Sequence, residues 1–303
     1  MFSRLYPYST SILWGRKRHK LIAEILIYGL ILFGLYTLLS LGFALIRGVA
    51  GIFNLAHGSL YLLCAYYISS FYPFLGLGIT ILVSLILTII SGIIIYQFFI
   101  HPLREKNIGA AVVTLSLALF ISALIKLIYG PEFISLPYLI EGYTTILGTR
   151  VVIQKLLSFI VTMILVGFLA LFVNRTRVGK SMKAVAQNMD VAKLVGINTR
   201  NTFMISMGIS ALLGGFAAVL FAPVYVVSPG GWTILFRAFP VLVLGGIGSL
   251  KGAVVGAFII AFTEKILEYT VQGGYFVQTA TFAVMLIIIF IRPTGLFGKK
   301  LNK

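Results

Sequence analysis

Charged residues, and acidic residues above all, are scarce in this sequence. Only 10% of the 303 residues are charged, and seven of them are Asp or Glu. A soluble domain carries roughly 25% charged residues, which cover its surface. This chain is 60% hydrophobic and has a mean hydropathy of +1.07. A soluble globular protein is therefore excluded, and we expect lipid to be the solvent for much of the chain.

Cysteine and histidine are also rare. Cys64 is the single cysteine and lies in an apolar run, so we expect a small buried hydrophobe and no disulfide framework. The three histidines, His19, His57 and His101, have no metal-ligand spacing. We therefore expect neither a metal nor a cofactor.

Catalytic motifs are missing as well. The sequence contains no H-E-x-x-H motif and no nucleophile elbow. Gly179-Lys180-Ser181 resembles the end of a P-loop, but Asn174 stands where that pattern needs glycine. Glu264 and Glu268 lie one turn apart near the end of an apolar run, where we expect an interfacial position. We predict no catalytic residues and no nucleotide binding by this chain.

Long apolar runs are what the sequence has in abundance. Only helices and closed β-barrels span lipid, and barrel strands would be about ten residues long with alternating polarity. The runs here are continuous and about twenty residues long, as a membrane helix requires. They are Leu21–Ile46, Val49–Tyr72, Leu75–Ile100, Ile108–Tyr129, Val151–Val173, Phe203–Val227, Trp232–Gly248, Ala253–Tyr269 and Tyr275–Ile291.

This pattern predicts an all-α integral membrane protein, a polytopic bundle of about eight or nine transmembrane helices with glycine-interrupted or re-entrant segments. We expect one transmembrane domain over residues 21–298, between a basic N-terminal tail of residues 1–20 and a basic C-terminal tail of residues 299–303. The first run is too long for a signal peptide and should stay as an anchor.

The net charge of +17 is concentrated in loops and tails. Clustered Lys and Arg mark cytoplasmic loops of membrane proteins, and this distribution argues against a nucleic-acid partner. We therefore place residues 174–200 and the C-terminus in the cytoplasm of a multi-pass cell-membrane protein, with residues 130–150 outside. The N-terminus stays open: three full crossings before residue 101 put it outside, and two crossings plus a re-entrant segment put it inside.

Two glycine-rich interruptions break the apolar runs. The first, residues 48–58, contains Asn54 and His57, which are costly at membrane depth without a partner. The second is residues 244–252, and paired interruptions point to a transporter's midplane site. An alternative is that Asn54 caps a helix and His57 makes a structural bond. The candidates for the translocation path are Asn54, His57, Gly58, Gly245, Gly246 and Gly248.

Small residues recur every four positions in two stretches. Lipid removes the hydrophobic drive between helices, so helices in membranes associate closely through small residues. We predict tight helix packing at Ser206, Ser210, Gly214, Ala218, Gly252 and Gly256.

The basic loop at residues 174–200 is expected to form two short helices, Lys180–Gln187 and Asp190–Val195. Asp190 suits an N-cap and Gly196 suits a helix stop. The loop is either a solvated basic segment at the lipid surface or, because it has small apolar residues to bury, a docking surface for a partner.

Four stretches in register resemble one family, the LivH-type permeases of branched-chain amino-acid ABC importers. They are Phe53–Leu60, Arg175–Asn198, Leu244–Ser249 and Arg292–Leu296. The similarity runs from about residue 25 to residue 298. It implies the fold of an ABC importer of the type II kind.

The resemblance also implies a coupling loop with one variable motif, EAA-x-x-x-G. Here only Ala192 of the first three residues and the final Gly196 are kept. The implied coupling residues are Arg175, Arg177, Gly179, Asp190, Ala192 and Gly196.

The implied function is ATP-driven import of branched-chain amino acids. The implied partners are a LivM-like second permease subunit, two ABC ATPase subunits that hydrolyse ATP, an extracellular or periplasmic substrate-binding protein, and the lipid bilayer. Permeases for urea, amides or other amino acids are alternatives, and an ion-coupled secondary transporter is a more distant one.

Overall fold

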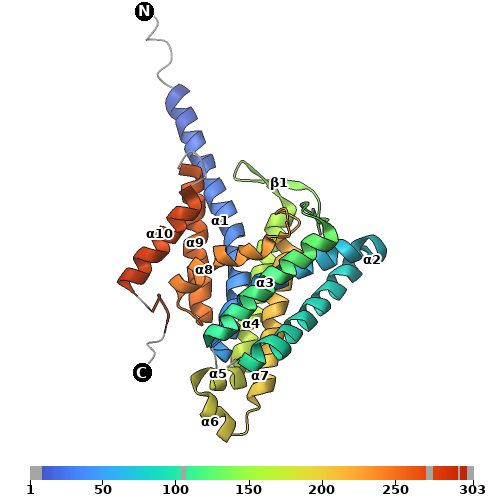
Figure 1. Cartoon of the computed structure of the whole chain (residues 1–303). Helices are drawn as coiled ribbons and strands as arrows, with labels where there is room; N and C mark the ends of the chain where they lie inside the picture. Colours follow the sequence, from blue (N-terminus) through green and yellow to red (C-terminus); the bar gives the residue numbers. More distant parts are fainter. Residues whose placement is uncertain (1–8, 104–106, 271–275, 293, 299–303) are drawn as a thin grey trace, which may run out of the picture.

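The computed structural model is almost entirely helical (Figure 1). It describes residues 9–103, 107–270, 276–292 and 294–298. The expected C-terminal tail, residues 299–303, lies outside these ranges. The α-helices are α1 (Ser9–Ala50), α2 (His57–Ile94), α3 (Asn107–Tyr129), α4 (Ile153–Arg175), α5 (Arg177–Gln187), α6 (Met189–Leu194), α7 (Thr199–Phe221), α8 (Ile234–Gly245), α9 (Leu250–Thr270) and α10 (Phe276–Ile291).

Helix α1 runs through the centre of the molecule and packs against α4, α7, α8 and α9 (Figure 1). From Ile31 to Ile46 every residue of α1 is buried. A helix that is apolar all round belongs in a core rather than at a surface, and this explains why α1 has no polar stripe. Phe33 fixes one contact, since its ring meets the ring of Phe258 on α9 edge to face at 5.7 Å. Helix α1 begins at Ser9, so residues 9–20 of the expected N-terminal tail are helical, and residues 1–8 lie outside the described ranges.

Helix α2 is bent in its middle, where two separate apolar runs were expected. As one straight helix its 38 residues would measure about 57 Å, nearly twice the hydrocarbon core of about 30 Å. Gly76 breaks it with φ 67° and ψ 168°, three residues after Pro73. The chain leaves α2 through a π-helical segment, η1 (Ile95–Ile100), and a 3₁₀ turn, η2 (His101–Leu103).

Five described helical segments are long and apolar enough to cross a membrane: Lys20–Ala50, His57–Leu103, Ile108–Tyr129, Ile153–Arg175 and Thr199–Phe221. A sixth is counted when Gly231–Gly245 and Leu250–Thr270, which are bent by 116°, are taken as one span. The chain is therefore a multi-pass helical protein. The expected count of eight or nine crossings is not confirmed.

A short β-hairpin departs from the all-α prediction. Strands β1 (Tyr143–Ile146) and β2 (Thr149–Val152) pair antiparallel, with Tyr143 opposite Val152. Leu147 (φ 50°) and Gly148 (φ 78°) form the two-residue turn, and positive φ at both positions is what a tight hairpin turn requires. The hairpin lies at the end of the bundle where α1 begins, and α5 and α6 lie at the opposite end (Figure 1).

Candidate translocation path and coupling surface

The two glycine-rich interruptions meet in space. Gly48 lies near the end of α1, and Gly248 lies in the bend between α8 and α9 with φ +86°. A Cβ atom at Gly48 would lie 2.7 Å from the carbonyl oxygen of Gly248, and one at Gly248 would lie 3.2 Å from the Cα of Gly48. Only glycine allows the two backbones to approach this closely.

At the bend between α8 and α9, backbone segments approach one another very closely. A Cβ at Gly245 would overlap the carbonyl of Gly252, and one at Gly246 would overlap the backbone of Gly298. The segment after α10 is hydrogen-bonded to this bend, since the Leu296 amide donates to the Leu244 carbonyl (2.8 Å). A second bond joins the Phe297 amide to the Gly245 carbonyl (3.0 Å). Gly256 faces the Val241 carbonyl of α8 in the same crowded way.

Asn54 and His57 are fully buried beside α7. The Asn54 Oδ1 accepts from the Ala56 amide (3.1 Å), and its Nδ2 donates to the Met207 sulfur (3.5 Å). The His57 Nδ1 lies 3.2 Å from the Ser210 hydroxyl oxygen. These bonds join the start of α2 to α7. Neither residue lines either of the two cavities described below.

The small residues of α7 form the surface against which Asn54 and His57 pack. Ser206, Ser210, Gly214 and Ala218 are all buried. A Cβ at Gly214 would lie 3.5 Å from the His57 ring. At the other side of α2, Gly58 is pressed against the Trp232 carbonyl of η3 (Gly231–Thr233). Gly58 therefore packs against η3 in this structure.

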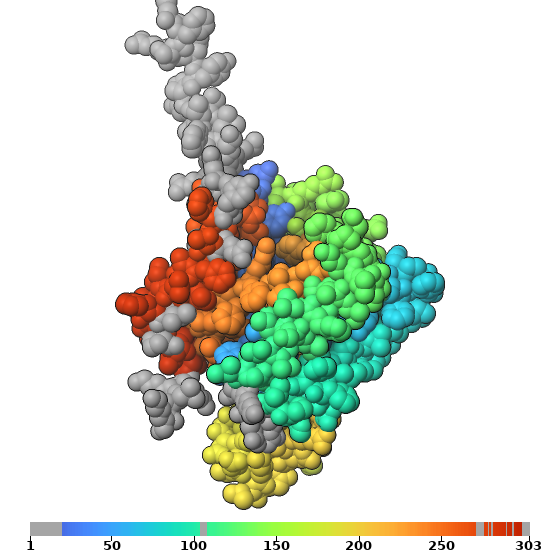
Figure 2. Space-filling model, viewed as in Figure 1, coloured from blue at the N-terminus to red at the C-terminus, as the bar shows by residue number. Residues whose placement is uncertain are grey.

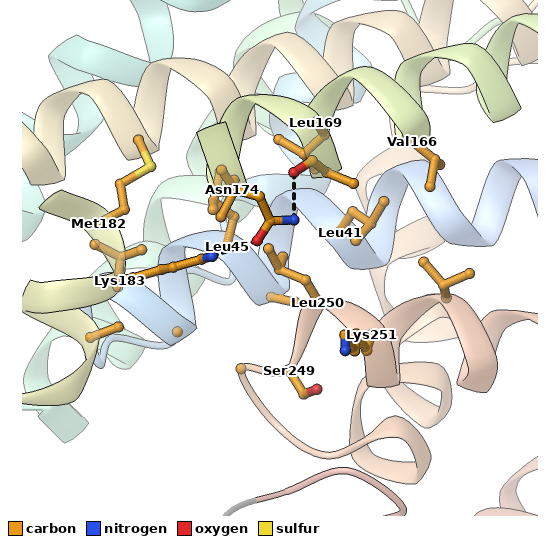
Figure 3. Close-up of a pocket in the computed structure, with 18 residues that line it drawn as sticks. Leu41, Leu45, Val166, Leu169, Asn174, Met182, Lys183, Ser249, Leu250 and Lys251 are labelled. Atoms are coloured by element: carbon orange, nitrogen blue, oxygen red, sulfur yellow. Dashed lines mark hydrogen bonds between the residues drawn. The ribbon is translucent and has the colours of Figure 1, made fainter. Parts of the chain in front are cut away.

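A cavity of about 500 Å³ opens beside the meeting point of the two interruptions (Figure 3). Gly48 and Gly248 both line it, together with the second half of α4. Helix α5 closes one side with Met182, Lys183 and Ala186. The wall is mainly apolar, and its polar side chains are Asn174, Lys183, Ser249 and Lys251.

Helix α5 is fixed firmly to the end of α4. The Thr176 Oγ1 caps α5 by accepting from the Gly179 amide (3.0 Å), and donates to the Phe172 carbonyl (2.8 Å). A Cβ at Gly179 would lie 2.5 Å from the Cα of Val173. In the cavity wall, the Lys183 Nζ donates to the Asn174 Oδ1 (2.5 Å). Figure 3 shows the Lys183 side chain extending toward Asn174, and its dashed line marks the bond from the Asn174 Nδ2 to the Ala170 carbonyl (2.7 Å). Arg175 and Arg177 are exposed.

Helix α6 is capped by Asn188, which corrects the prediction that Asp190 is the N-cap. The Asn188 Oδ1 accepts from the amides of Asp190 and Val191 (3.0 Å each). Asp190 instead pairs with Lys193 (3.2 Å). Gly196, with φ +82°, follows the end of the helix as expected.

One face of the α6 region is apolar and exposed. Ala192 is buried, but Val191 (54% exposed), Leu194 (86%) and Val195 (70%) are open. We refer to these three residues as the α6 patch. Figure 2 shows the α5–α6 region as a lobe that projects from the bundle. An exposed apolar cluster on a basic lobe is typical of a protein-protein contact.

A second cavity, of about 310 Å³, was not anticipated from the sequence. Its polar side chains include Tyr36, Tyr61, Tyr225 and Arg237. Burial raises the pKa of Tyr225 to about 12, and Glu268 adds to this rise. The sequence feature that indicates a functional group here is Arg237, because an ionisable residue inside an apolar run is a candidate functional group.

Long apolar helices, two glycine-lined breaks in contact, two cavities and a projecting helical lobe define a polytopic membrane permease. The chain belongs to the family described as the branched-chain amino acid transport system / permease component, which it matches over residues 25–292. The relatives in this family are transport components and not enzymes.

The curated relatives are similar along nearly their whole length. The high-affinity branched-chain amino acid transport system permease protein BraD of Pseudomonas aeruginosa is 28% identical, over 90% of this chain and 95% of BraD. LivH of Escherichia coli, which has the same description, is 26% identical over 89% and 94%. A probable branched-chain amino acid transport permease protein LivM of Methanocaldococcus jannaschii is 25% identical over 75% and 71%. No solved structure matches the chain.

Proposed function

We propose that this chain is the transmembrane permease subunit of an ATP-binding-cassette importer and forms part of the translocation path for branched-chain amino acids. One observation carries the proposal: a single cavity is lined by Gly48, by Gly248 and by helix α5. The two breaks and the basic loop are distant in sequence but share this one space. The names of the relatives support the substrate class.

The same cavity suggests how the coupling would work. The ATPase subunits dock on the α6 patch and displace the lobe when they bind ATP. Helix α5 is part of this lobe, and Thr176 and Gly179 hold it against α4, so α5 moves together with the end of α4. Since Met182, Lys183 and Ala186 form a cavity wall, this movement opens or closes the cavity on the cytoplasmic side.

The partners follow from this mechanism. We infer two ABC ATPase subunits on the cytoplasmic lobe and a substrate-binding protein at the hairpin end. We also infer a second permease subunit of the LivM type. The relatives from Methanocaldococcus jannaschii support this pairing, because one is named LivH and another LivM.

The membrane arrangement is part of the proposal. We count nine crossings: α1, the two arms of α2, α3, α4, α7, α9, α10 and, together with the bend that follows it, the short helix α8. Its 12 residues measure about 18 Å, short of a hydrocarbon core of about 30 Å. This places the start of α1 outside and the α5–α6 lobe and the C-terminus in the cytoplasm.

The direct test is uptake of labelled leucine by cells of the source organism from which the gene has been deleted. We expect deletion to abolish high-affinity uptake and the restored gene to return it, with valine competing and urea not competing. Undiminished leucine uptake in the deletion strain, or competition by urea alone, would overturn the substrate class.

A separate variant tests whether the α5–α6 lobe couples the permease to the ATPase subunits. Gly196 has φ +82° and open space around it, so Gly196→Arg costs about 1–2 kcal/mol of backbone strain and places a bulky cation beside the α6 patch. We expect uptake and ATPase association both to fall. If both stay at the level of the parent chain, the coupling assignment is wrong.

A further inference from the structure

The second cavity lies nearer the start of α1 than the first. Tyr36 and its neighbours on α1 line it, whereas Leu41, Leu45 and Gly48 line the first cavity. The opposite wall contains Val227, which forms an isolated antiparallel bridge with Ile134. This second cavity is therefore tied to the segment that precedes the β-hairpin.

Arg237 places a permanent positive charge in this cavity. It lies on α8 between Phe236 and Ala238, in an otherwise apolar helix. Charged side chains at membrane depth are costly, so they face the protein interior or a water-filled space. Among the described residues Arg237 forms no ion pair with a carboxylate. The Arg237 side chain is exposed, and its charge acts on Glu264 from beyond ion-pair distance. The planar arrangement of its N–H donors fits a carboxylate.

Tyr36 lines the cavity, and the direction of its hydroxyl is fixed. Its hydroxyl donates to the Glu264 Oε2 (2.7 Å), and Glu264 also accepts from the Thr281 hydroxyl (3.3 Å). Because the hydroxyl proton is used in this bond, the lone pairs of the oxygen remain free to accept from a donor. Glu264 does not line the cavity, so it acts as a positioning residue for Tyr36.

Aromatic and aliphatic groups complete the lining. Tyr61 and Tyr225 join Tyr36, and ring faces attract organic cations such as an ammonium group. Leu32, Leu35 and Ile234 supply aliphatic surface in the same space. The cavity thus offers a cation for a carboxylate, phenol groups for an ammonium and apolar surface for a hydrocarbon side chain.

We propose that this cavity is a transient binding site for the zwitterion of an aliphatic α-amino acid, with Arg237 binding the carboxylate and the tyrosines binding the ammonium. The inference rests on the proposed transport function and adds a site within the permease itself. It also gives a reason for the permease to discriminate against urea and simple amides, which carry neither charge.

The first test compares leucine uptake by three variants in the complete transporter. Loss of a hydrogen-bonded charge lowers binding by roughly 10- to 100-fold, so we expect a loss of that order in uptake for Arg237→Gln. Arg237→Lys keeps the charge and should retain a measurable part. The matched control is Lys126→Gln, which removes an exposed charge from α3 and should transport like the parent. Parent-level uptake by Arg237→Gln would overturn the inference.

The second test is local and does not depend on the substrate-binding protein. Cys64 is buried and is replaced by Ala, and Thr233→Cys or Ser228→Cys then places one thiol in the cavity lining. We expect L-leucine to slow labelling of both thiols by a methanethiosulfonate reagent. Leucinamide, which lacks the carboxylate, and 4-methylpentanoate, which lacks the ammonium, should give no protection. A thiol at Lys126→Cys should be labelled at one rate throughout.

The uptake and labelling experiments distinguish a failure of the zwitterion site from a failure of the transport function. If cells with the parent chain import leucine but neither thiol is protected, the zwitterion site is wrong and the transport function stands. Equal protection by leucine and by 4-methylpentanoate would show that the tyrosines do not bind the ammonium group. If the parent chain does not import leucine, the proposed function fails first.

Discussion

The backbone of Gly48 lies against the backbone of Gly248, although 200 positions separate them in the sequence. Gly48 lies near the end of the central helix α1, and Gly248 lies in the bend between α8 and α9. This contact joins the two halves of the chain at the edge of the larger cavity. A displacement of the bend between α8 and α9 would therefore act directly on α1.

A methyl group at this contact should separate the two halves. A Cβ at Gly48 would lie 2.7 Å from a backbone oxygen that cannot rotate away. We expect Gly48→Ala to destabilise the chain by about 1–3 kcal/mol, the usual cost of overpacking. The measurement is the thermal midpoint of the purified chain in detergent. Gly167→Ala on α4 is the control, since its Cβ would meet nothing within 4 Å, and its midpoint should not fall.

A charge in the α6 patch should release the ATPase subunits without unfolding the permease. Leu194 is 86% exposed, so Leu194→Glu disturbs no interior packing and surface changes of this kind shift stability by less than about 0.5 kcal/mol. We expect the ATPase subunits to be lost when the permease is purified through an affinity tag. Thr145→Glu, on the exposed side of the hairpin, should keep them. Retention by both variants would show that the patch is not the docking surface.

Gln154 should hold residues 136–142, which precede the β-hairpin, to the helix bundle. Its Oε1 accepts from the amides of Leu139 and Ile140, and its Nε2 donates to the Leu220 carbonyl of α7. Gln154→Leu leaves those two amides without this acceptor, at a cost of about 1–3 kcal/mol for an unsatisfied group. Hydrogen exchange of residues 136–142 should accelerate. Ser116→Ala, which removes only a bond within α3, should leave that exchange rate unchanged.

The membrane orientation can be tested with reporters. The proposed arrangement puts the start of α1 and the β-hairpin outside and the α5–α6 lobe inside. A thiol at Thr145→Cys in the Cys64→Ala background should react with an impermeant reagent in intact cells, and one at Lys180→Cys should react only after permeabilisation. The reverse pattern would invert the whole arrangement and remove the cytoplasmic assignment of the lobe.

Composition alone predicted that the chain crosses a membrane as helices, because an apolar run of about twenty residues admits few other structures. The two breaks were also visible, since glycine clusters interrupt the runs. The contact of Gly48 with Gly248 was not, because nothing in a local pattern says which break faces which. The α2 break at Gly76 was anticipated only as a gap between two runs.

Other features depended on tertiary context. Both Asn188 and Asp190 are good cap residues, and the structure starts α6 after Asn188, with Met189 packed against the core. The hairpin at 143–152 is short and only partly apolar, so its pattern gave no strand signal. Arg237 is a single cation in a glycine-rich apolar run, and this local pattern does not indicate a cavity. The cavity depends on tertiary contacts that bring Tyr36 and Tyr225 to the same space.

In the proposed function, this chain transports by movement of a cavity wall that partner ATPases drive. The measurement that tests it most directly is leucine uptake by liposomes that contain the complex purified with this chain and a substrate-binding protein. We predict uptake that requires ATP and is unaffected when ionophores remove the proton and sodium gradients. Uptake by the chain alone, or uptake that follows an ion gradient without ATP, would contradict the account.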